Sequence, residues 1–171
     1  MRIEANVADQ GGGAYLRGSS LTGDALAVEA NEADAGGGLY LWGGGDLGGI
    51  GAAVQGNDAR LGGGLFVDAP GGEVFHTGRV HANEALRGGG VFLLAGTLHA
   101  DTFTANRSTD GTGGAALVAV GAELDASDAD FGGPGVEDND PPDVFPEETR
   151  THEAFGTHAC FVRTGAGCTP C

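Results

Sequence analysis

The residues best suited to bind a cation lie close together in one acidic segment near residue 140. Carboxylate and amide oxygens are the ligands that Ca²⁺ prefers, and this segment offers them at Asp138, Asn139, Asp140 and Asp143. The segment is too short and too interrupted by proline for an EF-hand loop. Two interpretations are open: a Ca²⁺ site, or a solvated turn whose carboxylates face water.

The second group of reactive side chains is a set of cysteines near the C-terminal end, at Cys160, Cys168 and Cys171. In a secreted chain we expect a disulfide from Cys160 to Cys168 or Cys171, with one thiol left over. Together with His158, the three thiols also form a ligand set of the zinc type. A reduced, metal-free tail is the remaining interpretation.

A third group is an aromatic stripe, in which a ring recurs at one position of a repeated pattern. Its members are Tyr15, Tyr40, Phe66 and Phe92. These rings alternate with aliphatic residues, so in a strand they face the opposite side. Exposed rings would provide a surface on which sugar rings stack. The stripe would instead be structural if loops cover it, or if a bulge turns it inward.

Catalytic groups show no such recurrence. The 24 acidic residues are scattered, only 8 Lys and Arg are present, and the five histidines do not recur at one repeat position. Glycoside hydrolases need two carboxyl groups that flank one bond over a cleft. We therefore predict that the chain is not an enzyme, and that it needs no cofactor apart from the candidate Ca²⁺.

Composition limits the partners and the fold. The formal net charge of −16 repels nucleic acid and anionic lipid. No stretch approaches the roughly 20 apolar residues of a membrane span. The 35 glycines argue against helices, because glycine is a poor helix former, and their clustering indicates tight turns. Met1 leads straight into repeat sequence without an apolar leader, so we interpret the first repeat as truncated and the chain as a fragment.

The elements that must position these residues come from an internal repeat of about 25 residues. A tetrad of the form apolar-x-x-Asn occurs five times, and successive asparagines are 25, 26, 26 and 23 residues apart. The asparagines of the tetrads are Asn6, Asn31, Asn57, Asn83 and Asn106. Each tetrad is followed by a glycine cluster and a short apolar strand, as in Gly62–Gly64 and Leu65–Val67.

Short strands that cannot bury an apolar face alone are stabilised by stacking on their own copies. The repeat predicts an all-β fold, a right-handed parallel β-helix of about 5–6 coils, over residues 1–132. Residues 133–171 are predicted to form an acidic, proline-containing terminal loop and a cysteine-containing tail. Two aliphatic columns are expected to face inward, one of them at the first tetrad position. We expect Asn to adopt the left-handed conformation at one corner and glycine to form a second.

The paired motifs resemble the repeats of chlamydial polymorphic outer-membrane proteins, Phe-x-x-Asn and Gly-Gly-Ala-Ile/Leu/Val. The nearest matches are Phe103–Asn106 and Gly113–Ala116, and similar repeats occur in secreted bacterial β-helix proteins. The resemblance covers residues 1 to about 120, although Ile or Val mostly replaces Phe and no translocating membrane barrel follows. It implies a parallel β-helix in an extracellular, cell-surface or outer-membrane location, usually without catalysis.

The expected function is therefore a non-catalytic structural or adhesion module, acting as a monomer. Its expected partner is a surface glycan or a component of a host or neighbouring cell. The alternative is a β-helix that binds carbohydrate, or acts on it as a lyase or hydrolase.

Overall fold

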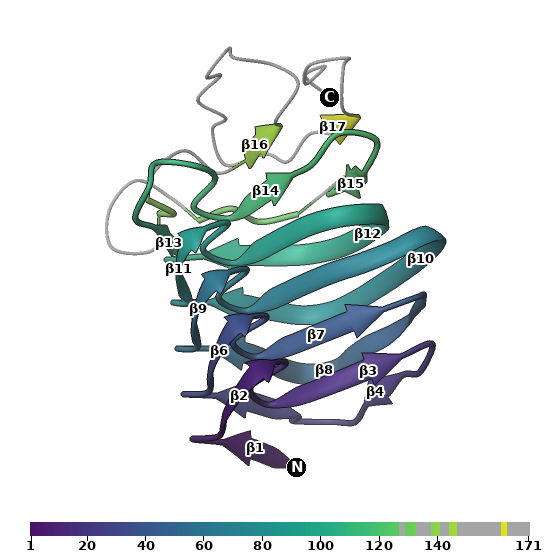
Figure 1. The fold of residues 1–171 in the computed structure, drawn as a ribbon. Coiled ribbons are helices and arrows are strands. Elements are labelled where there is room, and N and C mark those ends of the chain that lie inside the picture. Colours follow the sequence, from purple (N-terminus) through teal and green to yellow (C-terminus); the bar gives the residue numbers. More distant parts are fainter. Residues whose placement is uncertain (127–128, 133–137, 141–143, 147–161, 164–171) are drawn as a thin grey trace.

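The computed structural model describes residues 1–126, 129–132, 138–140, 144–146 and 162–163, and its regular structure there consists of β-strands (Figure 1). The strands are β1 (Arg2–Glu4), β2 (Val7–Gln10), β3 (Ala14–Arg17), β4 (Leu21–Thr22), β5 (Ala27–Glu29), β6 (Glu32–Ala35), β7 (Leu39–Trp42), β8 (Gly45–Gln55), β9 (Asp58–Leu61), β10 (Leu65–His81), β11 (Glu84–Arg87), β12 (Val91–Thr104), β13 (Arg107–Ser108), β14 (Ala116–Val118), β15 (Glu123–Asp125), β16 (Val144–Pro146) and β17 (Val162–Arg163).

The strands stack as a parallel β-solenoid of about 5 turns, which confirms the predicted parallel β-helix. A long sheet contains β1-β5-β8-β10-β12-β14-β16, and a short sheet follows the order β13-β11-β9-β6-β2. Equivalent residues of successive repeats are direct partners, as in Val28↔Val54 and Val54↔Val80. The repeat thus specifies the register, because each strand pairs with its own copy one coil away.

One coil runs along three faces of the solenoid and turns between them. After Val54 the chain turns at Asn57 into the short sheet, follows β9, and turns again at Gly62–Gly64. The first part of β10 then runs across the second face, and its last part returns beside β8 to Val80. Figure 1 shows the long strands β10 and β12 folding back on themselves, so that each belongs to two faces.

Aliphatic side chains fill the interior in columns. The predicted tetrad column is buried at Val28, Val54, Val80 and Phe103, and the second predicted column at Leu41, Val67, Leu93 and Val118. Ile3 and Leu16 belong to the same two columns but are only partly buried, since they lie in the first coil. A fully buried side chain of this kind contributes about 1.5–3 kcal/mol.

The tetrad asparagines form a continuous hydrogen-bonded ladder along one corner. The backbone N–H of Asn57 and its Nδ2 both donate to Oδ1 of Asn83, at 3.0 and 2.9 Å. The Nδ2 group also donates to the carbonyl of Val28 in the preceding coil, at 3.0 Å. The same pattern recurs at Asn31 and Asn83. The ladder confirms that the asparagines bind their copies above and below, and it satisfies polar groups that burial would otherwise penalise.

The predicted backbone conformation of the asparagines was wrong, because the residue before each of them takes the left-handed turn. The left-handed positions are Ala5, Ala30, Gly56, Ala82 and Ala105, with φ between 50° and 60°. The asparagine side chain therefore forms the hydrogen bonds of the ladder, and the residue before it forms the turn of the backbone. Alanine is strained in this region, and glycine is not.

We expect Ala82→Gly to raise the free energy of unfolding by about 0.5–1 kcal/mol. The substitution relieves the left-handed strain at φ 50°, and this gain exceeds the extra backbone entropy of glycine in the unfolded chain. Gly56 occupies the same corner position in the preceding coil, so Gly56→Ala should have the opposite effect. Denaturant titration of both variants measures the two changes in the free energy of unfolding. Changes of the same sign in both variants would contradict this account.

The glycine corner leaves no room for side chains, as the sequence predicted. A Cβ on Gly38 would lie 2.6 Å from the carbonyl oxygen of Gly64 and 2.8 Å from Cγ1 of Val54. The coils approach closely here because the backbone N–H of Gly38 donates to the carbonyl of Gly63 at 3.0 Å. Close backbone approach is thus the reason for a glycine at this position.

Gly38→Ala should lower the free energy of unfolding by about 2 kcal/mol, because the added methyl group forces neighbouring coils apart. Gly23 provides the matched control, since a Cβ there would meet nothing within 4 Å. Gly23→Ala should change stability by less than about 0.5 kcal/mol. Thermal unfolding of the two variants distinguishes corner packing from a general effect of losing glycine.

The stack continues past residue 132, where the sequence placed the end of the solenoid. Phe131 stacks on Phe103 with ring centroids 5.4 Å apart, and β16 pairs in parallel with β14. Asn139 forms the sixth rung of the ladder, because its Oδ1 accepts from the N–H and the Nδ2 of Asn106, both at 2.9 Å. These two asparagines are 33 positions apart in the sequence, yet they form the same hydrogen bonds as the other rungs.

Candidate functional site: two grooves on the long sheet

The predicted aromatic stripe lies outside the main core and forms a column of stacked rings. Centroids of Tyr15 and Tyr40 are 5.0 Å apart, those of Tyr40 and Phe66 4.7 Å, and those of Phe66 and Phe92 5.2 Å. Exposure falls along the column, from 44% at Tyr15 to 6% at Phe66 and 5% at Phe92. The buried end packs with Leu117 and Ala35.

Stacking within the stripe covers the ring faces that a sugar would need. Tyr40 and Phe66 each have a ring on both sides, so they present only their edges to a ligand. Burial is the main cause that raises the pKa of the Tyr40 hydroxyl, and the negative charge of Asp68 raises it further. The stripe therefore stabilises the outer side of the glycine corner, and Tyr15 is its accessible member.

In the acidic segment near residue 140, the structure places Asn139 in the asparagine ladder. The Oδ1 of Asn139 already accepts two hydrogen bonds from Asn106, and its Nδ2 donates to the carbonyls of Phe103 and Phe131 at 2.9 Å. This carboxamide is 7% exposed and belongs to the ladder, and the Ca²⁺ site stays a prediction. Asp138 and Asp140 are exposed on either side of it, and Asp143 lies outside the described residues.

The cysteine predictions at Cys160, Cys168 and Cys171, and His158 with them, also lie outside the described residues. Among the residues that the structure describes, no three His, Cys, Asp or Glu side chains are grouped to hold a metal ion. In the same part of the chain no helix has the length and apolar character needed to cross a bilayer.

The long sheet carries a ridge that the repeat pattern does not show. On β8, Gly48 pairs with Thr77 and Ala53 with Arg79, so residues 49–52 lie opposite the single residue Gly78. This bulge projects Ile50, which is 82% exposed. Gly49 adopts φ 138°, and a Cβ there would lie 2.7 Å from the carbonyl oxygen of Gly23. The two coils are equally long but distribute their residues differently between paired positions, and this difference creates a step on the sheet.

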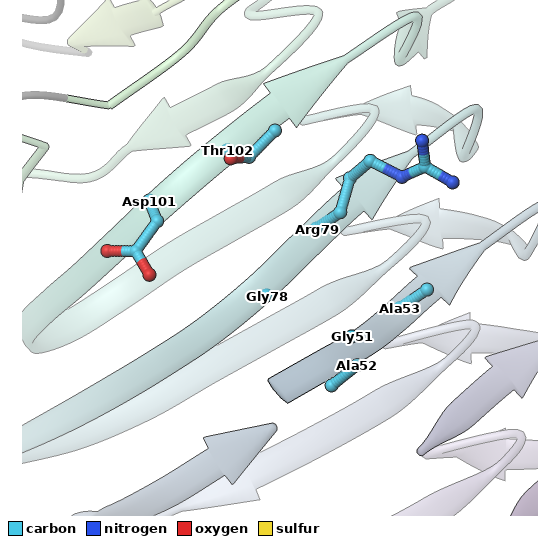
Figure 2. A pocket seen from close by; sticks show the side chains of 7 residues that line it. All are labelled: Gly51, Ala52, Ala53, Gly78, Arg79, Asp101 and Thr102. Atoms are coloured by element: carbon cyan, nitrogen blue, oxygen red, sulfur yellow. The ribbon is translucent and has the colours of Figure 1, made fainter. Parts of the chain in front are cut away.

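The first groove lies on the C-terminal side of this ridge and has a volume of about 340 Å³. Its floor is formed by small residues, Gly51, Ala52, Ala53 and Gly78. Figure 2 shows the charged side chains of Arg79 and Asp101 extending away from one another above β10 and β12. Arg79 reaches toward Oε1 of Gln55, with the two atoms 3.5 Å apart. The groove can thus hold a small polar molecule between opposite charges.

The second groove, called the Phe75 groove below, lies on the other side of the ridge and has a volume of about 460 Å³. Phe75, Thr77, Thr22, Asp24 and Asp46 contribute its aromatic, hydroxyl and carboxylate groups. Phe75 is 44% exposed, and its ring stacks on the imidazole of His99 at 4.4 Å with an interplanar angle of 5°. His99 in turn contacts Oδ2 of Asp125 through Nδ1 at 3.0 Å.

Behind this face, His76 points into the core, where it is 3% exposed. Its register partners are Leu47 on β8 and Ala100 on β12, and neither ring nitrogen has a hydrogen-bond partner in the described structure. Burial lowers the pKa of His76 to about 4, because a charged imidazole would lose its hydration there. Burial of this imidazole without a hydrogen-bond partner costs stability.

The outer face of the short sheet carries a column of carboxylates at Glu32, Asp58 and Glu84, which are register partners. Burial is the main cause that raises the pKa of Asp58, and the negative charges of Glu84 and Glu32 raise it further. Glu84 is paired with Arg107 at 3.4 Å. The column repeats carboxylates at the spacing of the coils, so that each lies beside another negative charge.

Sequence reasoning did not identify Phe75, Arg79, Asp101 or the ridge at Ile50. The one signal available was the irregular glycine run around Gly48–Gly51 within an otherwise regular repeat. The fold places the chain in the class of parallel β-helix proteins, which are built from repeated coils. No protein-family model matches the chain, and no curated protein or solved structure matches it.

Proposed function

We propose that the chain is a non-catalytic structural or adhesion module of a secreted or cell-surface bacterial protein. The observation that carries this proposal is the asparagine ladder, which runs without a break from Asn6 to Asn139. A buried polar ladder with every rung hydrogen-bonded makes neighbouring coils mechanically interdependent. Such a rod is suited to holding other surfaces at a fixed distance.

The dimensions support the same role. Parallel strands are about 4.8 Å apart, so five coils extend roughly 25 Å. The charge of −16 keeps the lateral surface hydrated and soluble. As partner we propose a surface glycan or another component of a host or neighbouring cell, bound by a monomeric rod.

A second candidate function is carbohydrate binding or carbohydrate turnover on the long sheet. The specific observation in its favour is the Phe75 groove, in which an exposed ring lies beside two carboxylates and two hydroxyl groups. Aromatic rings with a few convergent polar groups are typical of small-molecule sites. Turnover would additionally require two groups placed on either side of a scissile bond.

Two measurements on the full chain test the proposal. Beads coated with the protein should retain bacterial or host cells, whereas beads coated with an inert protein of equal charge should not. Incubation with neutral and acidic polysaccharides should release neither new reducing ends nor unsaturated products. Product release would overturn the non-catalytic function, and the absence of cell retention would overturn adhesion and leave only the spacer role.

A further inference from the structure

Phe75 differs from Tyr40 and Phe66 of the aromatic stripe, because only one of its faces is stacked on another ring of the described structure. His99 stacks on the face toward the following coil, at 4.4 Å and nearly parallel. The ring normal therefore runs along the solenoid axis, and the other face points to the preceding coil. The register partner there is Asp46, a short acidic residue, and the groove opens beside it.

The polar groups around this face favour a ligand that carries hydroxyl groups. Asp24 and Asp46 are exposed carboxylates, which accept hydrogen bonds and donate none. Thr22 and Thr77 add hydroxyl groups, which both donate and accept. An apolar face with carboxylates at its margin complements a pyranose ring, which has C–H groups on one face and hydroxyl groups around its edge.

The negative charge of the groove favours neutral glycans over acidic ones. The two carboxylates of the groove, and the net charge of −16, disfavour uronic acids, sialic acids and sulfated sugars. A volume of about 460 Å³ falls in the range of small-molecule sites and is suited to one or two sugar residues. Gly48 and Gly49 of the groove floor have positive φ, and Gly48 is held by β-pairing to Thr22 and Thr77, so the cavity is formed before a ligand arrives.

We propose that the Phe75 groove binds a neutral glycan, with one pyranose stacked on Phe75 and its hydroxyl groups donating to Asp24 and Asp46. This inference rests on the proposed adhesion function and names the ligand class and the site. Ile50, projecting from the ridge beside the groove, forms one wall and limits the direction in which the glycan can extend.

The test begins with an array of neutral and acidic glycans probed with the full chain. We expect signals from neutral hexose-containing glycans only. Titration calorimetry with the best neutral di- or trisaccharide should then show about tenfold weaker binding for Phe75→Ala and a smaller, several-fold loss for Asp46→Asn. The matched control is Tyr15→Ala, which removes a ring of the same 44% exposure outside the groove and should leave affinity unchanged.

Each outcome has a defined meaning once circular dichroism and thermal melting show that the variants are folded. Binding that is equal in wild type and Phe75→Ala would overturn the site, as would equal losses for Phe75→Ala and Tyr15→Ala. Preference for acidic glycans, or capture of an apolar peptide instead of any glycan, would overturn the ligand class. Cell retention by coated beads in the absence of glycan binding would overturn this inference and leave the adhesion function intact.

Discussion

Replacing Asn57 with leucine should lower the free energy of unfolding by about 4 kcal/mol, because it removes one rung from the middle of the ladder. Leucine has the same branched skeleton but is larger, so the loss of hydrogen bonds and some overpacking act in the same direction. Oδ1 of Asn57 accepts from the N–H and the Nδ2 of Asn31, both at 3.0 Å. Its own Nδ2 donates to the carbonyl of Val28. These buried groups would lose their partners, at about 1–3 kcal/mol each.

The corresponding change in melting temperature is a decrease of about 10 °C for a chain of this size. Asn6→Leu is the matched control, because Asn6 lies in the first described coil, is exposed, and donates through its N–H and Nδ2 to Oδ1 of Asn31. Its effect should be about 1 kcal/mol. Equal effects at the two positions, or an unchanged melting temperature for Asn57→Leu, would show that the ladder does not stabilise the stack.

His76→Leu should increase stability, and the increase should grow as the pH falls. The imidazole is buried with both nitrogens unpartnered, so its removal should gain about 2 kcal/mol at neutral pH. The pKa of His76 is lowered to about 4 in the folded chain, against about 6.5 when unfolded. The unfolded chain therefore binds this proton more readily, and wild-type stability is lost as the pH falls from about 6.5 toward 4, by about 3 kcal/mol.

In the leucine variant this part of the pH dependence should disappear, so the two stability curves diverge between pH 6.5 and 4. Denaturant titrations across that interval provide the measurement. Val74→Leu serves as the control, because Val74 is fully buried on the same strand but does not titrate. It should leave the pH slope unchanged. Parallel curves for wild type and His76→Leu would show that the imidazole reaches solvent or finds a partner.

The fold was predictable because stacking forces the same residue type to recur at the same place in each coil. The inward columns, such as Val54 and Val80, and the corners at Asn57 and Gly62–Gly64 follow directly from that requirement. The sixth rung was missed because a longer connection precedes Asn139 and no glycine cluster follows it. The left-handed turn was assigned to Asn rather than to its predecessor, since alanine is seldom found in that region.

The grooves were not predictable in the same way, because they arise where the coils differ. A bulge of residues 49–52 opposite Gly78 depends on the number of residues between paired positions rather than on their types. The environment of Phe75 likewise depends on its neighbours along the axis, His99 on one side and Asp46 on the other. The repeat pattern shows only the residues that the coils have in common, whereas the Phe75 groove is formed by residues that differ between coils.

The asparagine ladder also has a polarity along the solenoid axis. Each rung sends its N–H and Nδ2 donors toward the next rung, and receives donors at Oδ1 from the rung before. The rung-to-rung hydrogen bonds therefore all run in one direction, and their dipoles reinforce one another along the rod. A coil can join this ladder only if it presents its asparagine in the same orientation, so the solenoid can grow by tandem duplication of a coil but not by insertion of an inverted one.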